Sequence, residues 1–462
     1  MKVEQLYTNC LAEAAYYIES NGEAAIIDPL REYNPYIKKA KENGVTIKYI
    51  FETHFHADFV SGHIDLADHT GATIVYGPNA ETSFKAHTAK DGEVFKIGNV
   101  TLTLLHTPGH TLESSTYLLK DENQKPYCIF TGDTLFIGDV GRPDLAIKSD
   151  LTQEDLAGMM FDSLHNKIMP LADDLIVYPG HGAGSSCGKN LSSETWSTLG
   201  EQKKTNYALK TPTREAFVKE LTTGILPPPQ YFAKNAAMNK NGYEKIDSVV
   251  EKGNKGLSID EFDAAVKNGA LILDVRPKEV FSAEFIPGSL FIGLEGTFAM
   301  WVGALITDIK QPIVLICPEG KEGEAVLRLA RVGYDNTVGY LKGGVEAWKK
   351  AGRVIDIVES VSAESLEQLN PEHILDARKP GEFEAGHLEN AVNYPLDFIN
   401  DHLNDLHAGH KYYVHCKSGY RSVIAISILK QQGYKNLVDV LGGYSAIEKT
   451  NMPLVDVCTK NA

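Results

Sequence analysis

The sequence predicts a multidomain α/β protein, and three observations support this fold class. The chain has 462 residues, which is too long for one hydrophobic core and suggests roughly three domains. Up to about residue 245, short apolar runs alternate with turns rich in glycine, proline and aspartate and with amphipathic helical segments. Beyond residue 256 the chain repeats itself once, and a two-copy repeat of about 100 residues indicates two domains and not a solenoid. We therefore predict domains at residues 1–245, 256–352 and 358–462.

The composition is that of a globular protein outside the membrane. Hydrophobic residues make up 43% of the chain and charged residues 23%, which are ordinary values. The formal net charge of -16 argues against nucleic acid or an anionic membrane as the main partner. No apolar run is long enough to span a membrane, and the N-terminus lacks the apolar core of a signal peptide. Six cysteines without a C-x-x-C pair fit a reducing compartment, so we expect a cytoplasmic protein.

The segments that surround the expected site of the first domain can be assigned from their residue patterns. Residues 34–44 and 152–169 are predicted to form amphipathic helices, and residues 194–207 a polar helix. The three prolines at 227–229 forbid a helix and stiffen an extended connector. Residues 251–256, with the sequence EKGNKG, are the predicted linker to the repeat. The first domain is therefore expected to end in a helical and proline-rich connector.

The repeat aligns landmark residues of its two copies at nearly constant spacing. The pairs are Asp274 with Asp376, Cys317 with Cys416, and Gly343 with Gly442. Each copy reads as strand, turn, helix, strand, loop, helix and strand, followed by a G-G turn and a last helix. This order predicts two α/β domains with parallel sheets.

Four short motifs of the first domain follow apolar strands and offer imidazole and carboxylate groups. They are THFHAD with His54, His56 and Asp58, HTPGHT with His106 and His110, TGDT with Asp133, and YPGHG with His181. Imidazole and carboxylate groups suit zinc, iron(II) or manganese, and the strand ends fix their directions. With 15 histidines in the whole chain, four such motifs in this order favour a metal site over scattered loop histidines.

These motifs make residues 1–245 resemble the metallo-β-lactamase superfamily, in particular its branch of glyoxalase II and the persulfide dioxygenases. The resemblance implies an αββα sandwich of two sheets with outer helices. Glyoxalase II binds two metal ions, with an H-x-H-x-D-H motif, the G-H-T histidine, a bridging aspartate and a late histidine. Persulfide dioxygenases bind one iron ion. Carried over to this chain, their ligands imply His54, His110 and Asp133 around one mononuclear non-haem iron(II) ion.

Phe59 distinguishes between these two kinds of site. It stands where H-x-H-x-D-H has its last histidine, and a phenyl ring cannot ligate a metal. Two histidines and one carboxylate with open positions form the facial triad of non-haem iron(II) oxygenases. His56, Asp58 and His181 would then orient ligands or handle protons. Phe59 is also a departure from those persulfide dioxygenases that keep a histidine there, although it leaves the three implied iron ligands in place.

Arg142 lies in the string GRPD, which is similar to a string of persulfide dioxygenases. The residues leave two roles open for it. Arg142 meets a carboxylate or phosphate of the substrate or holds the iron ligands, or else it pairs with nearby Asp139 or Asp144.

Tyr178 and Cys187 flank His181 in YPGHGAGSSCGK and are candidate residues of the same pocket. Cys187 either accepts sulfur or is a packed core residue, and a lone cysteine after a glycine-rich turn is more often packed.

Cys416 leads a loop between an apolar strand and a helix, and Arg421 closes this loop. The other residues of the loop and the helix start are Lys417, Ser418, Gly419, Tyr420 and Ser422. Backbone N–H groups of such a loop hold an anion, helped by the helix dipole. The same field, with the charges of Lys417 and Arg421, favours a Cys416 thiolate, which is a nucleophile that accepts sulfur.

This loop resembles that of the rhodanese sulfurtransferases, in which the cysteine and the arginine are catalytic. Asp376, Arg378, the string GHLENA and the G-G turn match other rhodanese landmarks. Four residues separate Cys416 from Arg421, whereas tyrosine-phosphatase-like relatives have a wider loop for phosphate. A buried structural cysteine is the alternative.

The first copy of the repeat departs from the rhodanese pattern. It has Cys317 and Gly320 but Glu322 where the arginine is expected, with Glu319 and Glu324 nearby. Carboxylates raise the pKa of a thiol and repel sulfite or thiosulfate. We therefore interpret residues 256–352 as a degenerate rhodanese-like domain with a structural or docking role, and residual sulfur handling by Cys317 stays open.

Nearly the whole chain is similar to fused persulfide dioxygenase–sulfurtransferases. The resemblance implies that iron(II) and O₂ oxidise a persulfide of a thiol such as glutathione or coenzyme A to sulfite, and that Cys416 transfers sulfur to sulfite to give thiosulfate. It also implies a homo-oligomer, either a dimer or a tetramer. Two alternatives stay open, namely a zinc-dependent thioester hydrolase of glyoxalase II type and a non-catalytic sulfur-relay protein.

Overall fold

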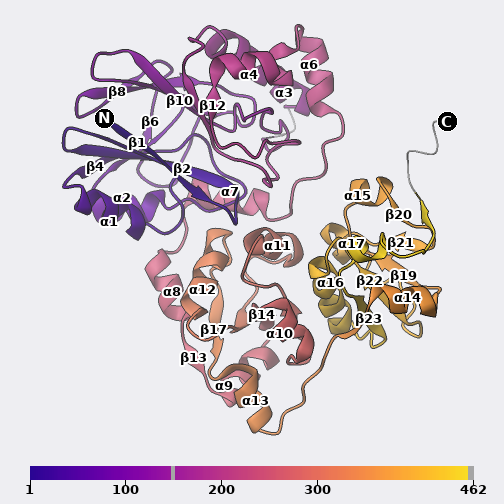
Figure 1. Ribbon diagram of the computed structural model, residues 1–462. Coiled ribbons are helices and arrows are strands. Elements are labelled where there is room, and N and C mark those ends of the chain that lie inside the picture. The colour runs from indigo at the N-terminus through magenta and orange to yellow at the C-terminus, as the bar shows by residue number, and fades with distance from the viewer. Residues whose placement is uncertain (147–150, 456–462) are drawn as a thin grey trace, which may run out of the picture. The chain divides into compact units, whose positions relative to one another are not determined.

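The computed structural model describes residues 1–146 and 151–455 (Figure 1). These residues divide into two compact units. The first comprises Met1–Asp247 with the short segment Leu329–Gly333, and the second comprises Ser248–Arg328 with the chain from Tyr334 onward. Among the described residues, no helix is both long and apolar enough to cross a membrane.

The first unit contains two six-stranded sheets. The strands of one sheet, in spatial order, are β1 (Lys2–Thr8), β2 (Glu13–Ser20), β3 (Glu23–Ile27), β4 (Thr46–Phe51), β5 (Thr73–Tyr76) and β6 (His87–Thr88). Those of the other are β12 (Ser197–Thr198), β11 (Ile176–Pro179), β10 (Pro126–Gly132), β9 (Ser115–Lys120), β8 (Val100–His106) and β7 (Val94–Ile97). Both sheets are mixed, because β3, β4, β5 and β6 pair in parallel, as do β10 and β11, whereas the other pairs are antiparallel.

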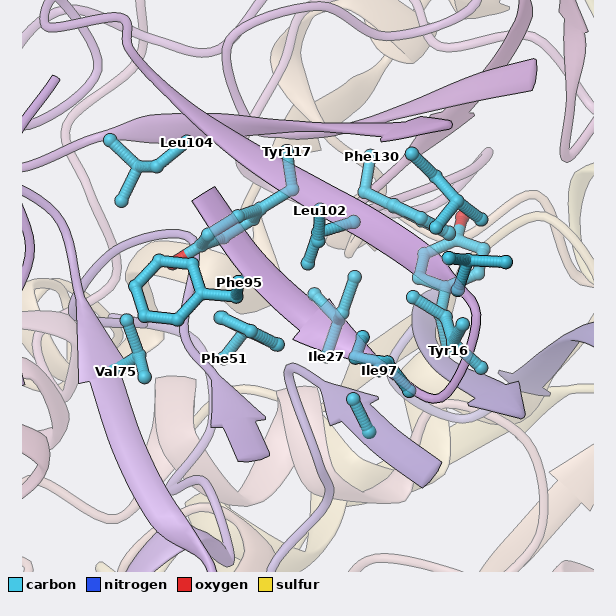
Figure 2. Packing of buried hydrophobic residues seen from close by; sticks show 14 of the residues in the cluster. Tyr16, Ile27, Phe51, Val75, Phe95, Ile97, Leu102, Leu104, Tyr117 and Phe130 are labelled. Carbon is cyan, nitrogen blue, oxygen red and sulfur yellow. The ribbon is translucent and has the colours of Figure 1, made fainter. Parts of the chain in front are cut away.

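A hydrophobic core lies between these two sheets (Figure 2). Along β8 the burial alternates, with Val100, Leu102 and Leu104 buried and the residues between them partly exposed. This period of two is that of a strand with one face in a core. Phe51 of the first sheet meets Tyr117 of the second, with ring centroids 5.0 Å apart. The two sheets are therefore packed face to face as a sandwich.

Helices cover the outer faces of this sandwich. The helices of the first unit are α1 (Asn34–Glu42), α2 (His63–Thr70), α3 (Gln153–Ser163), the π-helical turn η1 (Leu164–Ile168), α4 (Leu199–Thr205), α5 (Tyr207–Lys210), α6 (Arg214–Thr222) and α7 (Phe232–Asn241). Helices α1 and α2 contact β4 of one sheet. Helices α3 and α6 share a second buried cluster with β9 and β10 of the other. The predicted αββα sandwich is thereby confirmed.

Two of the three helices predicted in this unit form as expected, and the third is shorter. Helices α1 and α3 with η1 cover the predicted segments 34–44 and 152–169. The predicted helix 194–207 is wrong in its first part, because Ser197 and Thr198 form strand β12 and pair with β11. Pairing with the edge of the sheet satisfies backbone groups that a helix start would leave open.

The second unit contains two parallel sheets of five strands each, with the same strand order. The first sheet is β13 (Gly256–Leu257), β17 (Thr337–Leu341), β16 (Ile313–Ile316), β14 (Leu271–Asp274) and β15 (Leu290–Phe291). The second is β18 (Glu359–Val361), β23 (Leu437–Val440), β22 (Tyr412–His415), β19 (Ile374–Asp376) and β21 (Ala391–Asn393). The repeat seen in the sequence is therefore a repeat of the fold. A separate two-stranded sheet pairs β20 (His387–Leu388) with β24 (Leu454–Val455).

Helices connect the strands of both copies. Those of the first copy are α9 (Ile259–Lys267), α10 (Lys278–Ala283), α11 (Phe298–Leu305), α12 (Glu322–Arg331) and α13 (Gly344–Lys350). Those of the second copy are α14 (Ala363–Leu369), α15 (Pro380–Glu384), the 3₁₀ turn η2 (Leu396–Asp401), α16 (Tyr420–Gln431) and α17 (Tyr444–Ile447).

The predicted linker 251–256 is largely absorbed by secondary structure. Helix α8 (Ile246–Gly253) extends into it, and β13 begins at Gly256. Ile246 and Val249 of α8 are buried. Apolar side chains three residues apart form the buried face of a helix, so the helix continues into the charged residues that we predicted to be a linker. The domain boundaries that we predict from the sequence stay predictions.

Candidate functional site

The ends of four strands bring the predicted metal-binding motifs of the first unit together. Strands β4, β8, β10 and β11 end directly before, or within a few residues of, His54, His110, Asp133 and His181 respectively. The ligand atoms of His54, His110 and Asp133 all lie within 4.8 Å of one another, and all three side chains are buried. Nε2 of His110 is 3.4 Å, and Nε2 of His54 is 3.9 Å, from Oδ2 of Asp133.

Hydrogen bonds fix which nitrogen of each histidine faces the cluster. The hydroxyl of Thr53 donates to Asp28 Oδ2 at 2.8 Å and therefore accepts from Nδ1 of His54 at 2.9 Å. Nδ1 of His110 lies 2.8 Å from the carbonyl oxygen of Arg142, which can only accept. Both imidazoles consequently carry their proton on Nδ1, and the lone pair of Nε2 points to the cluster. Burial, with the neighbouring imidazoles, lowers the pKa of His54 well below its ordinary value, which keeps this ring neutral.

The three residues fit a metal ion. Nε2 of His54, Nε2 of His110 and both carboxylate oxygens of Asp133 are buried, and among the described residues they have no hydrogen-bond partner. Buried polar atoms without a partner are costly. Three such atoms within 4.8 Å of one another, one from each residue, are explained if a cation binds between them. Two imidazoles with a carboxylate are a donor set for iron(II), zinc or manganese.

His56 belongs to a different group of polar side chains. Its Nε2 lies 3.1 Å from Oδ1 of Asp28 and 3.4 Å from Oε2 of Glu52. Burial opposes a charge on this ring, but the two carboxylates outweigh burial and raise the pKa of His56 well above its ordinary value. A protonated imidazole has no lone pair for a metal, so in this arrangement His56 is engaged by carboxylates.

Phe59 is fully buried beside this histidine. Its ring centroid lies 4.3 Å from that of His56. The loop that carries both residues is held by Asn239 of α7, whose Nδ2 donates to the carbonyl oxygens of His56 and Phe59, each at 2.8 Å. Oδ1 of Asn239 accepts from the backbone N–H of Ser61 at 2.9 Å. An apolar ring thus lies against His56 at the position that follows Asp58.

Asp58, His181 and Cys187 complete the polar wall around Asp133. Nε2 of His181 is 3.3 Å from Oδ2 of Asp58 and 3.7 Å from Oδ1 of Asp133. The ligand atoms of His56, Asp58 and His181 lie within 4.8 Å of one another, as do those of Asp133, His181 and Cys187. Burial, together with the charges of Asp58 and Asp133, raises the pKa of Cys187 well above its ordinary value. Cys187 therefore stands at the cluster as a neutral thiol.

Arg142 and Tyr178 are engaged elsewhere. Nε and Nη2 of Arg142 contact the two carboxylate oxygens of Asp144 at 2.6 and 2.7 Å, which is the internal pairing that the sequence left open. Its backbone carbonyl, and not its guanidinium group, reaches the cluster through His110. Tyr178 packs against Phe130 and Tyr16 in the core between the sheets, and it does not join the polar cluster.

Cys416 directly follows β22 in the second unit and is buried. Its Sγ accepts a hydrogen bond from the backbone N–H of Gly419 at 3.1 Å. Gly419 has a φ of 97°, a conformation that favours glycine, and helix α16 starts at the next residue. One backbone N–H of the loop therefore points to the sulfur, and the anion-binding role of the loop stays a prediction.

The cations of this loop already have partners. Nη1 and Nη2 of Arg421 contact Oε2 and Oε1 of Glu382 at 2.5 and 2.8 Å. Lys417 is exposed, and its Nζ lies 5.3 Å from the ring centroid of Tyr444 and 3.9 Å from a carboxylate oxygen of Glu448. Ser418 is exposed.

Ser422 anchors the first turn of α16. Its buried hydroxyl donates to Oδ1 of Asp439 at 2.6 Å. Burial raises the pKa of Asp439 to about 6, although Ser422 and Lys278 act in the opposite direction. Arg378 pairs with Asp376 and lies over the ring of Tyr444, 3.9 Å from its centroid.

The corresponding loop of the first copy is acidic. Burial, with the charges of Glu322 and Asp274, raises the pKa of Cys317 far above its ordinary value. The first copy has the same Asp–Arg pair as the second copy, and Nη2 of Arg276 lies 2.7 Å from Oδ2 of Asp274. The two copies thus share the Asp–Arg pair of the scaffold, whereas their cysteine loops differ in charge.

Sequence reasoning missed four residues that position the two sites. They are Asp28, Thr53, Asn239 and Glu382. Asp28 carries the same signal as the predicted ligands, because it directly follows the apolar strand β3. Thr53 is adjacent to His54. Asn239 and Glu382 carry no local signal, since their partners are distant in the sequence or on another helix.

Comparison with known proteins assigns both parts of the chain. Residues 8–181 match the family model of the metallo-beta-lactamase superfamily, and residues 258–351 and 362–450 match that of the rhodanese-like domain. The chain is 32% identical over 210 residues to the human mitochondrial persulfide dioxygenase ETHE1, a match that covers 45% of this chain and 74% of that protein. It is 36% identical over 177 residues to a probable hydroxyacylglutathione hydrolase of Schizosaccharomyces pombe, covering 38% of this chain and 64% of that protein.

A solved structure is similar over more of the chain. The crystal structure of a metallo-beta-lactamase from Staphylococcus aureus superposes with a TM-score of 0.65 and 34% sequence identity. The match covers 74% of this chain and 98% of the other. The similarity therefore extends beyond the first unit into the repeat.

Proposed function

Since the chain belongs to the metallo-β-lactamase superfamily and continues into two rhodanese-like domains, we propose that it is an iron-dependent persulfide dioxygenase fused to a sulfurtransferase. One observation carries the first half of this proposal. His54, His110 and Asp133 form a buried group whose ligand atoms have no hydrogen-bond partner among the described residues. Nε2 of His56 and Nε2 of His181 also lack such a partner, but His56 lies between the carboxylates of Asp28 and Glu52 and against the ring of Phe59, which offers no donor. This arrangement favours one metal ion with open positions.

The protein's own residues orient the reactants at this site. Iron(II), when bound by the three residues, supplies the chemistry by which O₂ oxidises the outer sulfur of a thiol persulfide to sulfite. Thr53 and the carbonyl of Arg142 hold the two imidazoles in one tautomer and one direction. Phe59 excludes water from one wall of the site. His181 and Asp58, 3.3 Å apart, are placed to hold a proton beside Asp133.

Sulfur transfer is proposed for Cys416. Its thiolate attacks the outer sulfur of a second persulfide, R–S–SH, so that a new S–S bond forms on Sγ and the thiolate R–S⁻ leaves. The sulfur of sulfite then attacks the outer sulfur of this cysteine persulfide. The Sγ–S bond breaks, its electron pair returns to Sγ, and thiosulfate and a proton leave. The N–H of Gly419, which already donates to Sγ, stabilises the thiolate before and after each transfer.

Oxygen uptake by iron-loaded protein tests the first activity. The substrates are a panel of persulfides, including those of glutathione and coenzyme A, and the products are sulfite and thiosulfate measured by chromatography. We expect iron-dependent O₂ consumption over many turnovers. Zinc-loaded protein that hydrolyses thioesters of glutathione, together with iron-loaded protein that consumes no O₂, would contradict the proposal.

A thioester hydrolase of glyoxalase II type is the second candidate, and one observation favours it. His56, Asp58 and His181 lie close enough to form a second metal group, and relatives named hydroxyacylglutathione hydrolases match the same part of the chain. The metal content of the purified protein separates the two candidates, because the hydrolase needs two ions per chain and the dioxygenase one.

A non-catalytic sulfur relay is excluded if free persulfide supports multiple turnovers.

A further inference from the structure

A lysine of the degenerate copy lies beside the Cys416 loop of the other copy. Lys278 is the first residue of α10, and its Nζ is 3.4 Å from the position that a Cβ on Gly419 would occupy. Gly419 is the residue whose N–H donates to Sγ of Cys416. Both copies belong to the same compact unit. The first copy therefore contributes a cation to the surroundings of a cysteine that it does not itself carry.

Direct contacts hold the first copy against this loop. The hydroxyl of Tyr420 donates to the carbonyl oxygen of Gly293 at 3.2 Å, and its ring meets that of Phe291 edge to face. The backbone N–H of Phe291 donates to Oγ of Ser427, in α16, at 3.0 Å. These bonds join β15 and the chain after it to the helix that follows the loop. The first copy thus packs against the start of the helix that follows the Cys416 loop.

Lys278 differs from the other cations near Cys416 in the partners that it has. The guanidinium group of Arg421 makes two hydrogen bonds to Glu382, and Lys417 is directed to Tyr444 and Glu448. The side chain of Lys278 is 25% exposed, and Nζ lies 3.5 Å from Glu279, a carboxylate that is 77% exposed and strongly solvated. Asp439, 3.9 Å from the same Cβ position on Gly419, is the buried carboxylate that faces Lys278 from the second copy.

We propose that Lys278 completes an anion-binding subsite beside Cys416, which holds the sulfur oxyanion that accepts sulfur from the cysteine persulfide. The inference rests on the proposed sulfur transfer. An anion such as sulfite must approach a sulfur to which the backbone N–H of Gly419 donates, and an ammonium group beside Gly419 lowers the electrostatic cost of that approach. The degenerate copy is then part of the active site of the other copy, although its own cysteine loop is acidic.

The test compares K278M and K278R with the wild-type full-length chain. The matched control is K267M, which removes an exposed lysine from the last turn of α9 in the same copy. Two quantities are measured for each protein. One is the loading of Cys416 with one sulfur atom from glutathione persulfide, by mass spectrometry of the intact protein. The other is the rate of thiosulfate formation as a function of sulfite concentration.

We expect K278M to raise the KM for sulfite about tenfold, which is the loss of one charge-assisted contact, with kcat at saturating sulfite and Cys416 loading nearly unchanged. K278R should retain most of the affinity for sulfite, and K267M all of it. An unchanged KM in K278M overturns the inference. A parallel loss of loading, kcat and thermal stability in K278M and K278R also overturns it, because Lys278 would then be structural.

The double variant K278M/D439N addresses the neighbouring carboxylate. If Lys278 only neutralises Asp439, the double variant regains the wild-type KM for sulfite and the inference is overturned; if Lys278 binds the anion, the KM stays raised. Failure of the underlying function is distinguishable, since wild-type Cys416 would then take up no sulfur from the persulfide at all.

Discussion

Arg421 and Glu382 form a bidentate ion pair beside the Cys416 loop. Nη1 and Nη2 of Arg421 donate hydrogen bonds to Oε2 and Oε1 of Glu382 at 2.5 and 2.8 Å. Parallel contacts of this kind fix the plane of the guanidinium group. Glu382 lies in α15, whereas Arg421 lies in the first turn of α16. The pair therefore connects the loop to another helix of the same copy and restricts the positions that the guanidinium group of Arg421 can adopt.

Replacing this carboxylate should make the protein less stable in a pH-dependent way. The hydrogen bond from Arg421 lowers the pKa of Glu382 below its usual value of 4.5, although burial acts against it. A lowered carboxylate pKa adds stability above the unfolded-state pKa, and this contribution is lost as the pH falls through the folded-state pKa. We expect E382Q to lower the free energy of unfolding by about 1 kcal/mol at pH 7. This value is small for a bidentate ion pair because the pair is partly exposed and water screens its charges.

Urea unfolding of the full chain at pH 7 and at about pH 3 measures this effect. E384Q, which alters an exposed glutamate of the same helix, is the control and should equal the wild type at both values. The difference between E382Q and the wild type should disappear at the lower pH. A difference that is independent of pH would mean that Glu382 acts through packing and not through its charge.

The strand-end residues of the first unit were predictable from the sequence because their signal is local. An apolar strand followed at once by a histidine or an aspartate indicates both the element and the direction of the side chain. This signal marked the motifs of His54, His110 and Asp133 as a metal site, whereas the choice of these three as ligands came from the resemblance to persulfide dioxygenases; the structure brings the three together. The repeat was also predictable from the sequence, because the two copies can be aligned with each other and their shared residues then mark the same elements in both.

Other features depend on contacts that no local pattern reveals. Asn239 holds the loop of Phe59 although 180 residues separate them. Lys278 lies in a copy that the sequence marks as degenerate, and its proximity to Gly419 exists only after the two copies pack together. Arg142 illustrates a different limit, because both of its possible partners were visible in the sequence and only the geometry selects Asp144.

The hydroxyl of Thr53 should matter for metal affinity, although it does not reach the metal group itself. It accepts from Nδ1 of His54 and donates to Asp28, so T53V leaves the proton of Nδ1 without its acceptor and loosens the ring. We expect the affinity for iron(II) to fall about 10- to 100-fold. Competition with a chromophoric chelator under anaerobic conditions measures it.

T116V is the matched control for this variant. Thr116 is also a buried threonine, but its hydroxyl contacts Thr107 and not a predicted ligand. Equal metal affinities of T53V and the wild type would show that His54 needs no support from Thr53, or that His54 is not a ligand.

Phe59 should limit the number of metal ions. F59H would place an imidazole directly after Asp58 in the chain and against the ring of His56, at the position where the H-x-H-x-D-H motif has its last histidine. We expect the metal content after reconstitution with zinc to rise from about one to about two ions per chain, as measured by plasma mass spectrometry. F59L should stay at the wild-type value, because it changes the volume and adds no donor. A wild-type protein that already binds two ions would remove this role from Phe59.

The two proposed activities should separate in a single variant. Cys416 is not among the residues that form the metal group with His54, His110 and Asp133, so C416S removes no ligand atom from that group. We expect O₂ uptake with a thiol persulfide to stay within about twofold of the wild type, because no contact of the metal group is changed, while the product shifts from thiosulfate to sulfite. C317S is the control, since the raised pKa of Cys317 keeps it a thiol, and it should form thiosulfate like the wild type. Loss of O₂ uptake in C416S would instead mean that the cysteine persulfide itself is the substrate of the oxidation, and the two sites would then have to act in the opposite order.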